Sequence, residues 1–189
     1  MHTYGMPRFD LELWRSRAFE RDRRRPRGRL WHELAMISAI SRVVEWCGRS
    51  RIDVSFDGST GGTSHDDRIV VNARLAPERQ LHVLLHECGH WSLRRRKADW
   101  RRFRRGYGES DPAHLRTMAH RVDVLHEELE AWYEGLRIAD AAKVQVDLDR
   151  YNLTRSEYVR GYLKWALRAP GYEGGLEDEP KPERRKAPA

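Results

Sequence analysis

One pentapeptide constrains this chain of 189 residues more than any other feature. His86-Glu87-Cys88-Gly89-His90 sets two histidines four positions apart. On an α-helix both imidazoles then project from one face, one turn from each other. Both can reach a single zinc ion at Zn–N distances of about 2.0–2.1 Å. The pattern therefore predicts a helix here and a metal site on that helix.

The residues around the two histidines indicate a catalytic metal. Glu87 lies about 100° around the helix from His86, which is poor placement for a ligand. It is well placed to take a proton from a zinc-bound water, whose pKa falls toward about 7. Gly89 lets another backbone approach closely, at a cost of about 0.8–1.0 kcal/mol in helix propensity. Apolar residues share the other side of the helical wheel, so we expect them to be buried while the histidines face a cleft: Leu81, Leu84, Leu85, Cys88 and Trp91.

A third ligand must come from elsewhere in the chain, because catalytic zinc usually has three protein ligands and a water. A metzincin would carry glycine at position 93 and histidine at position 96. Here these residues are Leu93 and Arg96, which excludes that class. The densest acidic cluster follows at positions 126–132, with the sequence HEELEAW. Histidines available in the same part of the chain are His114, His120 and His126.

Glu128 is the predicted third ligand. It lies at the flank of a predicted apolar stripe, where a ligand must sit to reach across a packed interface. Glu127 is expected to point away from that stripe into solvent and Glu130 to lie further round, and both stay open as alternatives. The predicted stripe consists of Leu115, Met118, Val122, Leu125, Leu129, Trp132 and Leu136. Donors for an oxyanion on the same helix, none of them singled out, are Tyr133, His126 and His120.

The first half of the chain is predicted to form two helices and two short strands. Alternating apolar residues predict strands over 51–56 and 68–72, joined by a loop or hairpin turn over 57–67 that is rich in Gly, Ser, Thr and Asp. Apolar spacing predicts helices over 30–47 and 78–95. Gly48 is the expected stop of the first helix, and Pro77 suits the first turn of the second.

The second half is predicted to form two more helices. Asp111-Pro112 resembles the start of the long acidic helix. Thr154 and Glu157 have capping-box spacing before a last helix that runs through Leu167. We therefore expect an α+β fold that is mostly helical, with a small mixed β-sheet, the metal-binding helix and a long Glu-bearing helix.

One folded domain is predicted, over residues 29–168. Residues 1–28 are Arg-rich and are expected to be a flexible basic arm, and residues 169–189 a disordered tail. The two cysteines, Cys47 and Cys88, argue against a disulfide scaffold. No stretch approaches the roughly 18 apolar residues that span a membrane, and the start lacks the apolar core of a secretory signal. A cytoplasmic location is therefore expected, with no membrane partner.

Residues His86–Trp91, followed by Glu128-Leu129-Glu130-Ala131, resemble the gluzincin-type zinc metallopeptidases. They are most similar to the ImmA/IrrE-like group of phages, mobile elements and bacteria, over residues 52–139. In that group a Glu-x-x-Ala segment supplies the third ligand, which maps onto Glu128 and Ala131. An Asn or Asp often follows that Ala, where this sequence has Trp132.

The resemblance implies a zincin-like fold and one Zn²⁺ per chain, bound by His86, His90 and Glu128. It implies a hydrolase that cuts a peptide bond in a specific intracellular protein, with Glu87 as general base. It also implies that the strand before the active-site helix, 68–72, is a sheet edge beside the cleft, where an extended peptide can add as a further strand.

The formal charge of +7 raises a different function. Positions 94–105 carry eight basic residues with Trp100 and Phe103 interleaved, a pattern typical of nucleic-acid surfaces. A solvated loop is the favoured interpretation, and steering of an acidic protein substrate is a third. The alternative function is thus a basic nucleic-acid-binding protein with a structural or vestigial zinc site, although a structural site has no need of Glu87.

Overall fold

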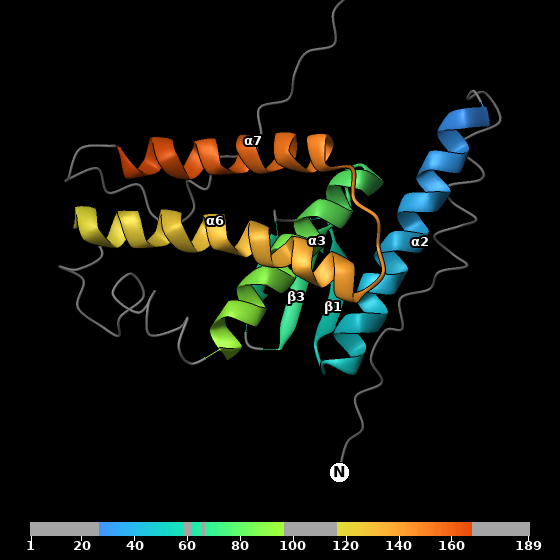
Figure 1. Ribbon diagram of the computed structural model, residues 1–189, viewed down its shortest axis with the longest axis horizontal. Coiled ribbons are helices and arrows are strands. Elements are labelled where there is room, and N and C mark those ends of the chain that lie inside the picture. The colour runs from blue at the N-terminus through green and yellow to red at the C-terminus, as the bar shows by residue number, and fades with distance from the viewer. Residues whose placement is uncertain (1–26, 59–61, 66, 97–116, 168–189) are drawn as a thin grey trace, which may run out of the picture.

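The computed structural model describes residues 27–58, 62–65, 67–96 and 117–167 (Figure 1). These ranges are mostly helical and contain a small sheet, as the predicted α+β class requires. The elements in chain order are α2 (Arg27–Arg49), β1 (Asp53–Asp57), β2 (Gly62–His65), β3 (Arg68–Asn72), α3 (Pro77–Arg95), α6 (Met118–Ala141) and α7 (Leu148–Ala166). The predicted arm and tail lie outside the described residues, except that α2 already begins at Arg27.

The three strands form one mixed sheet in the order β1-β3-β2. β1 pairs with β3 in parallel, with Asp53 opposite Arg68, and β2 pairs with β3 in antiparallel, with His65 opposite Arg68. Two expectations were therefore wrong. The segment 57–67 contains a strand, and Arg68–Asn72 is the central strand rather than an edge. β2 has no large apolar residue in its sequence, so alternation does not reveal it.

Helix α3 lies at the centre of the molecule. It packs against α2, α6 and the sheet, and α6 runs across it beside the antiparallel helix α7 (Figure 1). Pro77 occupies the first turn, as predicted. Every residue from Gln80 to His90 is buried, so the expected division into an apolar side and an open histidine side was wrong. The histidines face α6 instead of a solvent-filled cleft.

The buried face of α6 is offset from the predicted stripe. Met118 and Val122 are more than half exposed, whereas Val124, Ala131 and Ile138 are buried. The buried face is rotated by roughly 100°, which corresponds to a shift of one residue along the helix. Trp132 of the predicted stripe is fully buried, but the first part of the stripe lies on the exposed side, because the close contact with α3 is made by small residues.

The crossing of α3 and α6 explains that choice of small residues. A Cβ atom at Gly89 would lie 2.0 Å from the carbonyl oxygen of Ala131, and one at Gly135 would lie 2.8 Å from the carbonyl oxygen of Leu85. The two helices therefore meet backbone to backbone. This confirms the close approach predicted at Gly89. It also brings Glu127 and Glu128 of α6 within reach of α3.

Helix α6 begins at Met118, with Thr117 as its N-cap accepting a hydrogen bond from the backbone N–H of His120. The start predicted at Asp111-Pro112 lies outside the described residues. Helix α7 begins at Leu148. Its N-cap, Asp147, accepts hydrogen bonds from the backbone N–H groups of Asp149 and Arg150.

The capping box predicted from Thr154 and Glu157 was wrong. Thr154 lies inside α7, buried, with its Oγ1 2.9 Å from Nδ1 of His82. Glu157 instead forms an ion pair with Arg79 of α3. Neither side chain caps the helix, because both lie in its interior. They instead make contacts that hold α7 against α3.

The predicted stop of the first helix at Gly48 was also wrong. Helix α2 continues to Arg49, and Arg51 takes the left-handed conformation with φ 62°. The backbone N–H of Ile52 then bonds the carbonyl of Cys47 at 2.9 Å, the pattern of a Schellman cap. None of the helices in the described ranges combines the length and apolar character needed to cross a membrane.

Candidate metal centre

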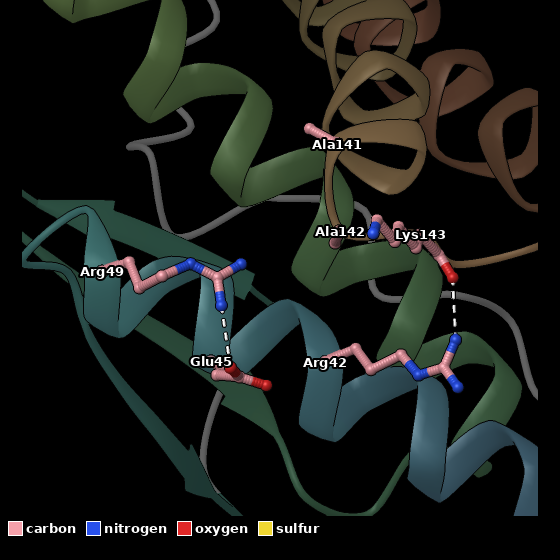
Figure 2. A pocket seen from close by; sticks show the side chains of 6 residues that line it. All are labelled: Arg42, Glu45, Arg49, Ala141, Ala142 and Lys143. Atoms are coloured by element: carbon pink, nitrogen blue, oxygen red, sulfur yellow. Dashed lines mark hydrogen bonds and ion pairs between the residues drawn. The ribbon is translucent and has the colours of Figure 1, made fainter.

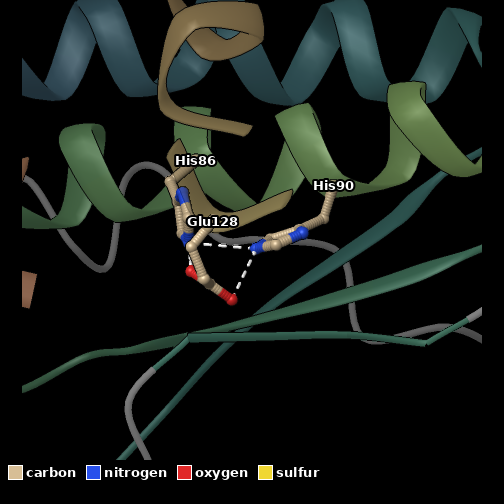
Figure 3. Close-up of side chains that lie close together, drawn as sticks. All are labelled: His86, His90 and Glu128. Carbon is tan, nitrogen blue, oxygen red and sulfur yellow. Dashed lines mark hydrogen bonds and ion pairs between the residues drawn. The ribbon is translucent and has the colours of Figure 1, made fainter. Parts of the chain in front are cut away.

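Three buried side chains from two helices converge on one point (Figure 3). His86 and His90 project from successive turns of α3, with their Nε2 atoms 3.1 Å apart. Glu128 reaches them from α6, with Oε2 3.1 Å from Nε2 of His86 and Oε1 3.3 Å from Nε2 of His90. In the part of the chain that the structure describes, these three residues form the group that could hold a metal ion, with one donor atom of each within 4.8 Å of the others.

The spacing of these atoms fits a tetrahedral metal ion. Donors at metal–donor distances of about 2.0–2.1 Å in a tetrahedron are separated by about 3.3–3.4 Å. The two imidazole nitrogens are 3.1 Å apart, and each lies 3.1–3.3 Å from a different oxygen of Glu128, so the carboxylate spans both histidines. Two imidazoles and one carboxylate are also a common donor set for catalytic metal ions. The residues present therefore fit an ion with three protein ligands and one position left over.

Burial and charge oppose each other in this cluster. Burial by itself lowers the pKa of His90, but the charge of Glu128 and hydrogen bonds with Glu127 and Glu128 raise it to about 10. Burial likewise raises the pKa of Glu128, yet His90 and His86 hold it well below its usual range. The carboxylate thus stays ionised in the interior, where it attracts a proton or a metal cation.

Glu127 is buried, not solvent-exposed as predicted. Its residue exposure is 1%, and its Oε1 lies 3.0 Å from Nδ1 of His90. The prediction failed because the buried face of α6 differs from the predicted apolar stripe: Glu127 lies on the same buried face as Val124 and Ala131. Glu130 lies outside the cluster, with its side chain 36% exposed and 3.7 Å from His126.

His86 is held differently from His90. Its ring stacks on Trp132 of α6, with centroids 4.4 Å apart and planes 22° from parallel. Among the described residues its buried Nδ1 atom has no hydrogen-bond partner. Glu127 was left open as an alternative ligand and Trp132 was placed on the apolar stripe, but their contacts with His90 and His86 were not predicted. The signal that could have found them is the spacing of Ala131 and Gly135, which marks the face of α6 that packs closely.

Glu87, the predicted general base, follows His86 directly on α3. It is 6% exposed, and its charge contributes to the raised pKa of His90. Within the described ranges no hydrogen bond or ion pair engages its carboxylate. The predicted general base is therefore buried on the same helix as the two histidines.

The remaining candidates from the sequence lie elsewhere. His120 packs edge-on against Trp165 at 6.2 Å, and His126 is about half exposed. Tyr133 is half exposed beneath the guanidinium of Arg155, 5.1 Å from its ring centroid. His114 lies outside the described residues.

The basic segment at 94–105 is described only as far as Arg96. Arg95 pairs with Asp67 and lies 5.0 Å from the ring of Trp91, and Arg96 pairs with Glu134 at 2.9 Å. These contacts are intramolecular. Positions 97–105 lie outside the described residues, so a nucleic-acid surface there stays a prediction.

A shallow pocket lies at the junction of α2 with the end of α6 (Figure 2). Within it Arg49 bonds Glu45 at 2.8 Å and Arg42 bonds the carbonyl oxygen of Lys143 at 2.9 Å. None of the residues lining it belongs to the His–His–Glu cluster.

Comparison with known proteins adds no relative. Models of known protein families give no match to this chain, and neither the curated protein sequences nor the solved structures contain a significant match.

Proposed function

We propose that the protein is a zinc-dependent metallopeptidase of the gluzincin type. The observation that carries the proposal is the convergence of His86, His90 and Glu128, with donor separations of 3.1–3.3 Å and an unengaged Glu87 beside them. A HExxH helix crossed by a second helix that supplies a glutamate is also the arrangement that a zincin-like fold requires. In this proposal His86, His90 and Glu128 bind Zn²⁺, and Glu87 is the general base.

The chemistry divides between the ion and the chain. Zinc bound at this position supplies a Lewis acid that lowers the pKa of water toward about 7 and polarises a carbonyl. Glu87 accepts a proton from the attacking water at its carboxylate and returns it to the leaving amine nitrogen, so the carboxylate is regenerated after each peptide bond is cut. The buried setting of Glu87 strengthens its interaction with charges that develop nearby.

The substrate is proposed to bind as an extended strand. The sheet order leaves β2 as an outer strand, and β2 packs next to α3. A peptide can add to such an edge through backbone hydrogen bonds. The peptide-binding edge therefore moves from Arg68–Asn72, where the sequence predicted it, to Gly62–His65.

Metal analysis of the purified full chain tests the proposal. We expect about one zinc per chain in the wild type and in Glu87→Gln, because Glu87 is not a ligand. Glu128→Ala should lose the zinc, whereas Glu130→Ala, a change of the same kind two residues along the same helix, should keep it. A wild type that carries no zinc and fails to bind it tightly when offered would reject the proposal.

Activity is best measured on a proteome-derived peptide library, with new termini identified by mass spectrometry. Removing a general acid–base group typically costs on the order of 10²–10⁴-fold in rate. Glu87→Gln is therefore expected to lose cleavage by about that factor while it retains zinc and its circular-dichroism spectrum. Equal cleavage by wild type and Glu87→Gln would contradict the assigned role.

A further inference from the structure

We propose that Glu127 is a positioning residue for the metal. Its carboxylate accepts a hydrogen bond from the Nδ1–H group of His90 and so holds the Nε2 atom of that histidine toward the ion. The inference rests on the proposed function of the site. It adds a residue that neither the motif nor the predicted ligand set includes.

The contact is direct and enclosed. Oε1 of Glu127 lies 3.0 Å from Nδ1 of His90, and the two side chains are 2% and 6% exposed. An imidazole that donates from Nδ1 to a carboxylate keeps the lone pair on Nε2 for a metal. Nε2 of His90 is the atom that lies next to Nε2 of His86 and Oε1 of Glu128. The hydrogen bond therefore fixes both the rotation and the tautomer that binding requires.

Among the described residues, Glu127 has no partner other than His90 to explain its burial. Its second oxygen, Oε2, is buried and has no hydrogen-bond partner among the described residues. Burying a carboxylate with one oxygen unsatisfied is unfavourable unless nearby positive charge compensates it. Glu127, Glu128 and Glu87 together place three carboxylates around two imidazoles, so a divalent cation would relieve the excess of negative charge.

The two histidines are supported unequally. His90 has a carboxylate on its outer nitrogen, whereas the outer nitrogen of His86 has no partner in the described ranges and its ring rests on Trp132. A stacked ring restrains the plane of the imidazole but accepts no proton from it. The orientation of the site by hydrogen bonding therefore depends on Glu127 alone among the described residues.

The test compares Glu127→Ala and Glu127→Gln with Glu130→Ala, all in the full chain. Removing an outer carboxylate from a metal-bound histidine typically weakens metal binding 10–100-fold. We expect the zinc dissociation constant, measured by competition with a chromophoric chelator, to rise by about that factor in Glu127→Ala. The dissociation constant should rise less in Glu127→Gln, because the amide oxygen still accepts the hydrogen bond from Nδ1–H but carries no charge. Glu130→Ala should match the wild type.

A second measurement uses the metal-free protein. The wild type and Glu130→Ala should each show a downfield imidazole N–H proton resonance assigned to Nδ1 of His90, protected from exchange by the hydrogen bond. The resonance should be absent in Glu127→Ala. The absorption spectrum of the Co²⁺-substituted protein should change in Glu127→Ala and stay unchanged in Glu130→Ala, a difference that packing alone would not produce.

The outcomes separate this inference from the proposed function. If Glu127→Ala, correctly folded by circular dichroism, binds zinc as tightly as Glu130→Ala, the positioning role is overturned even though the metal site stands. If the wild type binds no zinc but shows the Nδ1 resonance, the hydrogen bond stands and the metal site falls. A missing Nδ1 resonance in the wild type would overturn the contact on which the inference depends.

Discussion

Three histidines recur at four-residue intervals on α3, and their surroundings differ more than their spacing suggests. His82 lies 2.9 Å from Oγ1 of Thr154, and its burial lowers its pKa to about 4. His90, two turns later, faces carboxylates that raise its pKa to about 10 in spite of burial. All three residues lie on one face of α3, but His82 contacts α7 and His90 contacts the carboxylates of α6, so the pKa values of these two histidines shift in opposite directions.

The depressed pKa of His82 predicts a loss of stability in acid. Below the usual value of 6.5 the unfolded chain binds a proton at His82 that the folded protein does not take up until about pH 4. The contribution of a neutral His82 is therefore intact above about pH 6.5, declines as the pH falls, and is fully lost near pH 4. The difference between a pKa of 6.5 and one of about 4 corresponds to about 3 kcal/mol.

Urea denaturation of metal-free wild type and His82→Gln at pH 7, 5.5 and 4 measures this effect. The glutamine can still donate a hydrogen bond to Thr154 but does not titrate. The free energy of unfolding of the wild type, minus that of the variant, should fall by about 3 kcal/mol between pH 7 and pH 4. The charge of His90 affects both proteins alike and cancels. A difference that does not vary with pH would contradict the prediction.

At the residue scale the sequence was most informative where spacing alone carries the geometry. The four-residue interval of His86 and His90 predicted one shared face, and the structure brings Glu128, the predicted partner, to both. It could not predict the environment of Glu127, because that depends on which face of a distant helix is buried. Trp132 was noted as a departure from the family pattern, but its stacking on His86 follows from three-dimensional packing.

At the element scale the site depends on how closely two helices cross. Glu128 reaches the histidines because the backbone of α6 at Ala131 lies directly against Gly89 of α3. Hydrophobic periodicity weights large side chains, so it predicted Met118 and Val122 as core residues although both are exposed. A crossing made of Gly and Ala is nearly silent in such a pattern. For the same reason β2, which lacks large apolar residues, went unnoticed.

The close crossing predicts opposite effects of the same substitution at two glycines. In Gly89→Ala the new Cβ would lie 2.0 Å from the carbonyl oxygen of Ala131, so α6 must move. Overpacking of this kind costs on the order of 3 kcal/mol, and the displacement of Glu128 should also weaken zinc binding. Gly48→Ala has no atom within 4 Å of the new Cβ, and it should hold or raise stability by up to about 1 kcal/mol.

Chemical denaturation and zinc titration of the two variants check this. Gly48 lies near the end of α2, away from the α3–α6 crossing, and serves as the matched control for the intrinsic preference of alanine over glycine in helices. If Gly89→Ala is as stable as the wild type and binds zinc equally well, the close approach of the two helices does not determine the position of Glu128.

At the scale of the whole molecule, an apolar core and a buried charged cluster lie side by side. The core joins residues of α2, the sheet, α3, α6 and α7, and it does not include the ligands. The class of fold and the order of most elements were predictable, because each helix or strand carries its own local pattern. The boundaries of the domain at residues 28 and 169 stay predictions, since both flanks lie outside the described ranges except for the first two residues of α2.

This arrangement predicts a protein that folds without metal but is markedly stabilised by it. The apolar core should keep the metal-free chain helical, while the charges of Glu128, Glu127 and Glu87 leave the α3–α6 interface short of positive charge. A ligand that binds only the folded state stabilises it by about 2.7 kcal/mol at 100 times its dissociation constant and about 4.1 kcal/mol at 1,000 times. For a chain of this size that corresponds to a rise in melting temperature of roughly 5–15 °C.

Thermal unfolding of the full chain with zinc and with a chelator measures the shift. The wild type and Glu130→Ala should lose it when the chelator is added, whereas Glu128→Ala should melt at one temperature in both conditions because the bridge between the helices needs this carboxylate. Far-UV circular dichroism should show the same helical content in all metal-free samples. A zinc-dependent shift that survives in Glu128→Ala would place the ion elsewhere, and a wild type that unfolds on chelation would mean that the apolar core cannot hold α6 against α3 without the metal.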